Sequence, residues 1–133
     1  MAMSAQREAF DRAIAAWNAA DLDQYLELYD EQIQLHGYTE QAMGKPEVRG
    51  FYQGLFAALS DIVLEIHDVV ESGNLLGCGF TMHGTHTGEL AGIAATGRRI
   101  QQPGVTILRF DGDRVVERHS VADFDTVVAQ LTA

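Results

Sequence analysis

Several residue types are scarce in this chain, and each scarcity excludes a structural feature or a class of partner. Cysteine occurs once among the 133 residues, as Cys78, so an internal disulfide is excluded. Lysine also occurs once, as Lys45, and nine Lys and Arg residues stand against 19 Asp and Glu residues, a formal net charge of −10. A negative surface repels phosphate backbones and anionic lipids, so we expect no nucleic-acid partner and no membrane partner.

Long apolar runs are missing as well. No stretch approaches the roughly 20 apolar residues that a membrane-spanning helix needs, and the N-terminus lacks a basic start followed by an apolar core. We therefore expect a cytoplasmic protein. The length, with 47% hydrophobic and 21% charged residues, predicts one globular domain over residues 1–133 that can bury a core and an interior pocket.

Hydrophobic periodicity predicts three helices in the first half of the chain. Phe10, Ala13 and Trp17 recur at helical spacing within residues 4–20, and a shorter pattern follows within residues 22–29. A third helix over residues 46–59 begins at Pro46, which is favoured in the first helical turn. Between the second and third helices, residues 32–38 alternate as in a short strand.

The second half of the chain is strand-like. Residues 62–124 contain turn signals at 72–74, 89–95 and 111–113, of which the Asp-Gly pair at 111–112 is the strongest hairpin signal. These turns predict four antiparallel strands, and a helix over residues 124–131 follows. The expected fold class is α+β, with a curved, mostly antiparallel sheet wrapped over about three N-terminal helices.

The last predicted strand carries the groups of greatest chemical interest. Strict alternation places Val115, Glu117, His119, Val121 and Asp123 on one face, and Val116, Arg118, Ser120 and Ala122 on the other. If the first set faces inward, two carboxylates and an imidazole line the interior. Burying such groups is costly unless they are hydrogen-bonded or functional, so they form a candidate acid/base site.

Five segments of the second half carry a family resemblance. They are Gly84-Thr85-His86-Thr87-Gly88-Glu89, Thr96-Gly97-Arg98, Arg109-Phe110-Asp111-Gly112-Asp113, Glu117-Arg118-His119-Ser120-Val121-Ala122-Asp123 and Gln130-Leu131. Together they resemble the SnoaL-like polyketide cyclases, small cofactor-free enzymes built on the cone-shaped α+β barrel that ketosteroid isomerase and the nuclear transport factor share.

The resemblance implies an intramolecular aldol condensation on a small hydrophobic, polyketide-like carbonyl substrate. The family places a catalytic Asp late in the last strand, which makes Asp123 the expected general acid/base. His119 stands where the family usually has Trp and adds a group that titrates near neutrality. His36 lies where family members offer the substrate a polar side chain. The alternatives are that Asp123 caps the terminal helix and that His36 is a surface residue.

Six further residues are candidates for substrate binding: Trp17, Tyr25, Phe56, His86, Thr106 and Glu117. Trp17 and Tyr25 either stack on a substrate or belong to the core, and His86 is either a pocket residue or a buried hydrogen-bonding strut. His83 and His86 lie three residues apart on a strand and face opposite ways, with no further ligand spaced to join them. The sequence therefore predicts no metal and no cofactor.

Two other functions remain open, and assembly is also predicted. The same barrel serves as a non-catalytic small-molecule-binding protein, or as an isomerase or dehydratase.

Family members are commonly dimers. An apolar face of the terminal hairpin predicts a homodimer; it comprises Val105, Ile107, Val116 and the stem of Arg109 or Arg118, opposite Thr106, Leu108, Glu117, His119 and Asp123.

Overall fold

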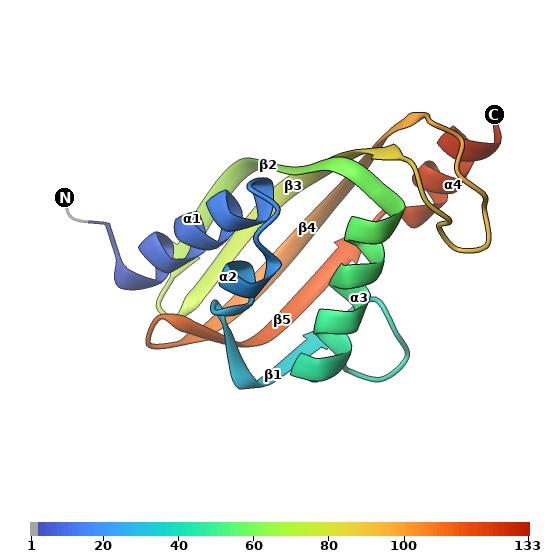
Figure 1. Ribbon diagram of the computed structural model, residues 1–133. Coiled ribbons are helices and arrows are strands. Elements are labelled where there is room, and N and C mark those ends of the chain that lie inside the picture. Colours follow the sequence, from blue (N-terminus) through green and yellow to red (C-terminus); the bar gives the residue numbers. More distant parts are fainter. Residues whose placement is uncertain (1–2) are drawn as a thin grey trace.

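The computed structural model describes residues 3–133. The first two residues, which are part of the basis for the expected absence of an N-terminal signal, lie outside the described residues. The predicted order of elements is confirmed (Figure 1). The elements are α1 (Ala5–Asn18), α2 (Leu22–Leu26), β1 (Tyr29–His36), α3 (Lys45–Ala58), β2 (Leu59–Ser72), β3 (Leu75–His86), β4 (Arg99–Asp111), β5 (Arg114–Ala122) and α4 (Phe124–Thr132).

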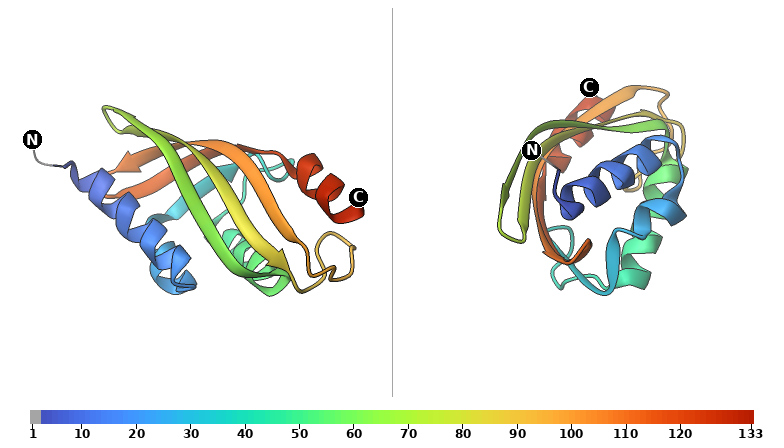
Figure 2. Two further views of the ribbon diagram at one scale, coloured as in Figure 1. Left: turned by 90° about the horizontal axis from the view of Figure 1, so that it is seen from above. Right: turned by 90° about the vertical axis from the view of Figure 1, so that its left-hand side faces the viewer.

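One curved sheet of five strands organises the fold. Its order is β1-β5-β4-β3-β2, with antiparallel pairing from β2 through β5 and parallel pairing between β1 and β5. Helices α1, α2 and α3 lie on the concave side of the sheet, and α4 lies at the end where β5 finishes (Figure 2). The α+β class and the wrapped sheet are therefore confirmed.

Two boundaries differ from the sequence prediction. The second helix ends at Leu26, and Tyr29 already belongs to β1, where it is fully buried and pairs with Val115. The strand then ends at His36, because Gly37 takes a φ of 112°, which side chains rarely adopt. A Cβ at Gly37 would collide with the carbonyl oxygen of Ser120, so this glycine lets β1 approach β5 closely.

A β-bulge in the terminal hairpin decides which side chains enter the interior. Arg109 pairs with Glu117, but Phe110 pairs with Val115, so Val116 is an extra residue that breaks the alternation. Val115 and Arg118 consequently both point inward and are buried, whereas Glu117 turns outward. Strict alternation therefore assigned the wrong residues of β5 to the interior.

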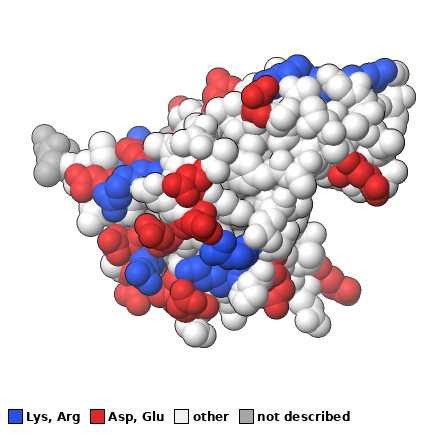
Figure 3. Space-filling view, viewed as in Figure 1, with Lys and Arg blue, Asp and Glu red and all other residues white. Residues whose placement is uncertain are grey.

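In the view of Figure 1, charged side chains lie mainly around the periphery of the described residues (Figure 3). Acidic side chains gather over the part of the molecule where α2 and β1 lie, with some basic side chains among them, while the centre of this face is largely uncharged (Figure 3). None of the helices within residues 3–133 is both long enough and apolar enough to cross a membrane.

Candidate ligand cavity

A cavity of about 230 Å³ lies between the concave face of the sheet and the helices. Its wall is mostly apolar, and the polar side chains that line it include Gln102, Arg118 and three tyrosines. Small-molecule sites are typically apolar cavities with a few placed polar groups, which is the pattern here. The aromatic residues of the wall are Trp17, Tyr25, Tyr38, Phe51, Tyr52, Phe80 and Phe124.

Aromatic packing fixes the floor of the cavity. Trp17 of α1 meets Tyr25 and Tyr52 edge-on, with ring centroids 5.0 and 5.1 Å apart, and Phe56 packs against it at 4.7 Å. Edge-to-face contacts of this kind are attractive and hold rings in defined orientations. The indole Nε1 of Trp17 is buried and has no hydrogen-bond partner among the described residues, so the wall keeps an unused donor.

Arg118 of β5 is the most unusual residue of the cavity. Its side chain is buried, and Nη1 donates hydrogen bonds of 2.6 Å to the hydroxyls of both Tyr29 and Tyr52. Its Nε donates to Thr106 Oγ1 at 2.9 Å. A further hydrogen bond of 3.0 Å links the hydroxyls of Tyr25 and Tyr29, so the guanidinium ends a chain of phenol groups.

Tyr25 and Tyr52 of this network are neutral phenols, and the guanidinium is charged. Burial raises the pKa of Tyr25 and Tyr52 well above the ordinary tyrosine value, and this effect outweighs the opposing charge of Arg118. Burial alone lowers the pKa of Arg118, but the surrounding tyrosine oxygens outweigh burial and raise the pKa above its usual value. The cavity therefore contains a fixed positive charge.

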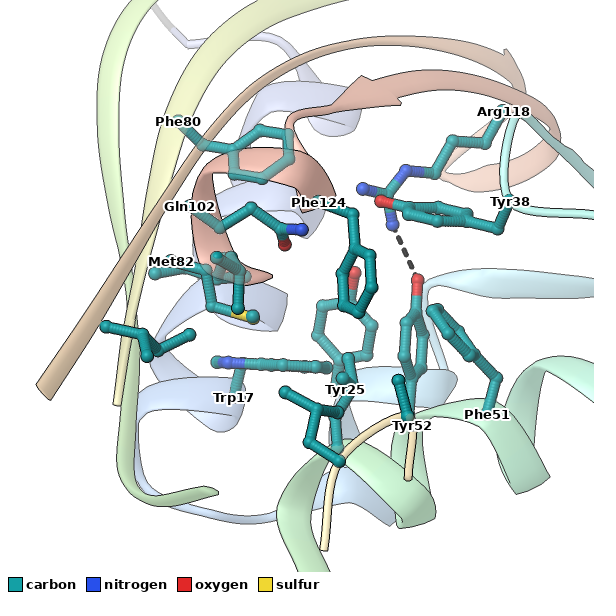
Figure 4. A pocket seen from close by; sticks show the side chains of 16 residues that line it. Trp17, Tyr25, Tyr38, Phe51, Tyr52, Phe80, Met82, Gln102, Arg118 and Phe124 are labelled. Carbon is teal, nitrogen blue, oxygen red and sulfur yellow. Dashed lines mark hydrogen bonds between the residues drawn. The ribbon is translucent and has the colours of Figure 1, made fainter. Parts of the chain in front are cut away.

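Part of that charge is free to meet a ligand. Hydrogen bonds to protein account for Nε and Nη1 of Arg118 in the described chain, which leaves the two N–H groups of Nη2 without a protein acceptor. The guanidinium points into the cavity, and the amide of Gln102 points toward the same space from the opposite wall (Figure 4). A ligand oxygen placed between them would meet donors from both sides.

Four of the predicted binding residues lie in or around this cavity. Trp17 and Tyr25 line it, whereas Phe56 packs behind Trp17. Thr106 is buried below the cavity, where its hydroxyl accepts from Arg118 and is hydrogen-bonded to the hydroxyl of Ser120 at 2.7 Å. Trp17 and Tyr25 thus line the cavity and Phe56 and Thr106 do not, and the roles of all four in binding stay predictions.

His86 lies away from the cavity wall. It is fully buried, and its Nδ1 lies 2.9 Å from the hydroxyl of Thr96 and accepts a 3.2 Å hydrogen bond from the Thr96 backbone N–H. The backbone of His86 also holds the loop before β4, through bonds with Gly97 and Arg98. Of the two alternatives, the structure favours the strut.

His36, Glu117 and His119 lie together, but on the outer face of the sheet. The Nε2 atoms of both imidazoles are 3.5 Å from an oxygen of Glu117, and the two rings stack with centroids 4.4 Å apart. The prediction that Glu117 and His119 face the interior is wrong, because the bulge at Val116 turns them outward. One nitrogen or oxygen atom from each of these three side chains lies within 4.8 Å of the others, a grouping that the sequence argument from His83 and His86 did not consider.

Asp123 is exposed and begins α4. Its carboxylate accepts from the backbone N–H of Thr126 at 3.0 Å and from the Thr126 hydroxyl at 2.5 Å. These hydrogen bonds lower the pKa of Asp123, whereas a general acid needs a raised pKa. The predicted interior position is therefore wrong, and the alternative of a helix cap is confirmed.

The sequence did not predict three tyrosines, a glutamine and an arginine in or beside the cavity. Arg118 was assigned to the outer face, and Tyr29 was assigned to a helix. In the sequence, tyrosines at helical spacing cannot be distinguished from ordinary core residues. No local sequence signal predicts the bulge that turns Arg118 inward. The overlooked set is Tyr29, Tyr38, Tyr52, Gln102 and Arg118.

The sheet curves over the helices and encloses an apolar cavity that contains the Arg118 guanidinium. These features define a small α+β protein with an interior space of ligand size. Within that class, the chain belongs to the SnoaL-like polyketide cyclase family, whose model matches residues 7–131. A comparison with curated proteins gives no match.

Solved structures share this fold closely. AclR from Streptomyces galilaeus, described as a candidate hydroxylase, is 24% identical with a TM-score of 0.88 over 95% of this chain and 94% of its own. IdmH from Streptomyces antibioticus, described as a candidate polyketide cyclase, is 25% identical with a TM-score of 0.83 over 96% and 99%. TsrD from Streptomyces laurentii is 19% identical with a TM-score of 0.85 over 100% and 98%.

Proposed function

We propose that the cavity binds a small hydrophobic carbonyl compound and stabilises its enolate oxygen at Arg118. The observation that carries this proposal is the buried guanidinium with two unoccupied N–H groups in an apolar cavity. A fixed charge in a water-poor site interacts strongly with developing negative charge and needs no reorganisation during the reaction. Enolate stabilisation is the chemistry that an aldol condensation of the polyketide-cyclase type requires. In this proposal the C–H proton passes to solvent, because no carboxylate or imidazole among the described residues lines the cavity.

Two wall groups extend this chemistry. The neutral hydroxyl of Tyr52 already accepts from Arg118, so its own proton is available for a ligand oxygen or for the tyrosine chain. Gln102 offers a second donor on the facing wall. Isomerisation and dehydration also pass through an enolate, so the same groups support all three reactions. The proposal includes no cofactor, a cytoplasmic location and a single domain over residues 1–133.

A second candidate is ligand binding without turnover. Among the described residues, those lining the cavity include no Asp, Glu or His side chain, which are the usual proton acceptors at carbon. On this alternative, Arg118 holds an anionic or enolised ligand and no C–H bond is broken. The two candidates share a ligand class and differ only in proton transfer.

Exchange of C–H hydrogens separates the two candidates. With 2-acetylnaphthalene in D2O, catalysis predicts that the protein accelerates deuterium exchange into the methyl group, measured by proton NMR. Arg118→Met should abolish the acceleration, because the enolate loses its charge partner, and Tyr52→Phe should reduce it. Arg109→Gln is the matched control, since Arg109 lies on the outer face of the sheet.

The outcomes divide cleanly. Acceleration lost in the Arg118→Met protein but kept in the Arg109→Gln protein supports catalysis. Saturable binding of the ketone without acceleration supports the binding-only candidate. Acceleration that persists in a folded Arg118→Met protein would contradict the assignment of Arg118.

A further inference from the structure

The outer face of the sheet carries a second group of chemically capable side chains. Parallel pairing sets His36 of β1 directly opposite His119 of β5, and Gln34 opposite Glu117. Because side chains alternate along a strand, His36, Glu117 and His119 share the outer face, while Leu35 is buried on the inner face beside Arg118. The group therefore stands on two adjacent strands, which hold side chains more rigidly than a loop does.

The spacing of these side chains fits one metal ion. One ligand atom from each of the three lies within 4.8 Å of the others. The Nε2 of His36 is 3.5 Å from Glu117 Oε2, and the Nε2 of His119 is 3.5 Å from Glu117 Oε1. In a tetrahedral zinc site with ligand bonds of about 2.0–2.2 Å, neighbouring ligand atoms are roughly 3.3–3.6 Å apart. The two imidazole rings stack in parallel with centroids 4.4 Å apart, so one ring has to turn out of the stack before both Nε2 lone pairs point at the same ion.

Within this group, His36 is left without a hydrogen bond. The Nε2 of His36 is buried and has no hydrogen-bond partner within residues 3–133, although Glu117 is close. A buried nitrogen without a partner costs free energy. A shared cation would use this nitrogen and draw the two imidazoles toward the carboxylate.

We propose that His36, Glu117 and His119 bind one divalent transition-metal ion, of which Zn²⁺ is the representative. Two imidazoles and a carboxylate are typical donors for Zn²⁺ and similar borderline metals, whereas Ca²⁺ and Mg²⁺ prefer oxygen ligands alone. In the single chain the side chains are 33%, 32% and 57% exposed, in the order named, so a fourth position is open to water there. This site lies across the sheet from the cavity and does not depend on the proposed function.

Two electrostatic features bear on affinity. The Nε of Arg109 lies 3.4 Å from Glu117 Oε1 and competes with the ion for that oxygen. The formal net charge of −10 favours cations in general.

Calorimetric titration of the purified, metal-free protein with Zn²⁺ tests the proposal. We expect one ion per chain, and a visible absorption spectrum of bound Co²⁺ with nitrogen and oxygen ligands. Loss of an outer-shell partner typically weakens metal binding 10–100-fold, so His36→Gln and His119→Gln, which each remove a ligand, should weaken it by at least about tenfold. His83→Gln is the matched control, because it removes an imidazole from the two-membered pair with Glu65 at 2.9 Å.

Arg109→Gln provides a test in the opposite direction. It removes the competitor for Glu117 without removing a ligand, so Zn²⁺ should bind more tightly than to the wild-type protein. The proposal is overturned by an absence of saturable binding, by equal binding in the His36→Gln and His119→Gln proteins, or by weaker binding in the Arg109→Gln protein. Circular dichroism of each variant checks that the fold is intact.

Discussion

Arg118 carries its charge in an interior where tyrosine hydroxyls, rather than a carboxylate, are its partners. An unpaired buried ion is strongly unfavourable, and the hydrogen bonds from Arg118 to Tyr29, Tyr52 and Thr106 offset part of that cost. Neutral acceptors leave the positive charge uncancelled. An anionic or enolised ligand therefore gains more at this position than it would beside an Arg–carboxylate pair.

The same network makes stability depend on alkaline pH. Tyrosines in an unfolded chain ionise near pH 10, while the raised pKa keeps Tyr25 and Tyr52 protonated in the folded protein. Above about pH 10 the unfolded state has lost protons that the folded state retains, so the free energy of unfolding should fall as pH rises.

Urea denaturation between pH 8 and pH 11 measures this effect. Tyr25→Phe should flatten the pH dependence, because phenylalanine ionises in neither state. A wild-type protein with constant stability from pH 9 to pH 11 would show that these phenols are not protected.

Asp123 is the N-cap of α4. Asp123→Ala should lower the melting temperature, because α4 loses its cap, while Asp123→Asn should keep it, since asparagine is an equally good cap. Both the cavity and any exchange activity should survive the Asn substitution within about threefold. A loss of about 100-fold or more in a folded Asp123→Asn protein would restore Asp123 as the acid/base, because such groups contribute at least that much.

At the scale of elements, β5 joins the two faces of the molecule. After the bulge, the side chain of Arg118 points into the cavity, whereas Glu117 and His119 lie on the outer face. Hydrophobic periodicity predicted the helices and strands, because that signal is local. The bulge at Val116 and the parallel pairing with β1 depend on contacts distant in sequence, so the inward set and the meeting of His36 with His119 could not be predicted from spacing.

Gly37 controls how closely β1 approaches β5. Gly37→Ala should destabilise the protein by about 2 kcal/mol or more, because φ is positive and the new Cβ meets the Ser120 carbonyl. Gly50→Ala is the control, since it lies on an exposed position of α3 with no atom within 4 Å of the new Cβ, and should stabilise by about 0.5–1 kcal/mol. Chemical denaturation compares the two. Equal stability of both variants would contradict the close approach.

At the scale of the whole molecule, the outer face leaves apolar side chains in solvent. Val105, Ile107 and Val121 are 58%, 52% and 72% exposed on neighbouring positions of β4 and β5. We propose that a second copy of the chain covers this patch, forming a homodimer. Arg118, one of the two arginines whose stem was expected on this face, points inward instead.

Light scattering at micromolar concentration tests the dimer. The wild-type protein should have twice the mass of one chain, and Ile107→Glu should be monomeric, because a charge in the centre of the patch opposes burial. Val70→Glu is the control, since Val70 is 68% exposed on β2, away from β4 and β5. A monomeric wild-type protein, or an Ile107→Glu protein that remains dimeric, would contradict the proposal.

We propose above that Arg118 holds the enolate oxygen of a ligand in the cavity. Benzoylacetone tests it directly, because its enol and enolate absorb at different wavelengths and its ionisation can be followed on the protein. Binding to the wild-type protein should lower the pKa of benzoylacetone, since the guanidinium stabilises the anion. The Arg118→Met protein should lose this shift, and the Arg109→Gln protein should keep it. An unchanged pKa on binding to the wild-type protein, or a shift that persists in a folded Arg118→Met protein, would contradict the account.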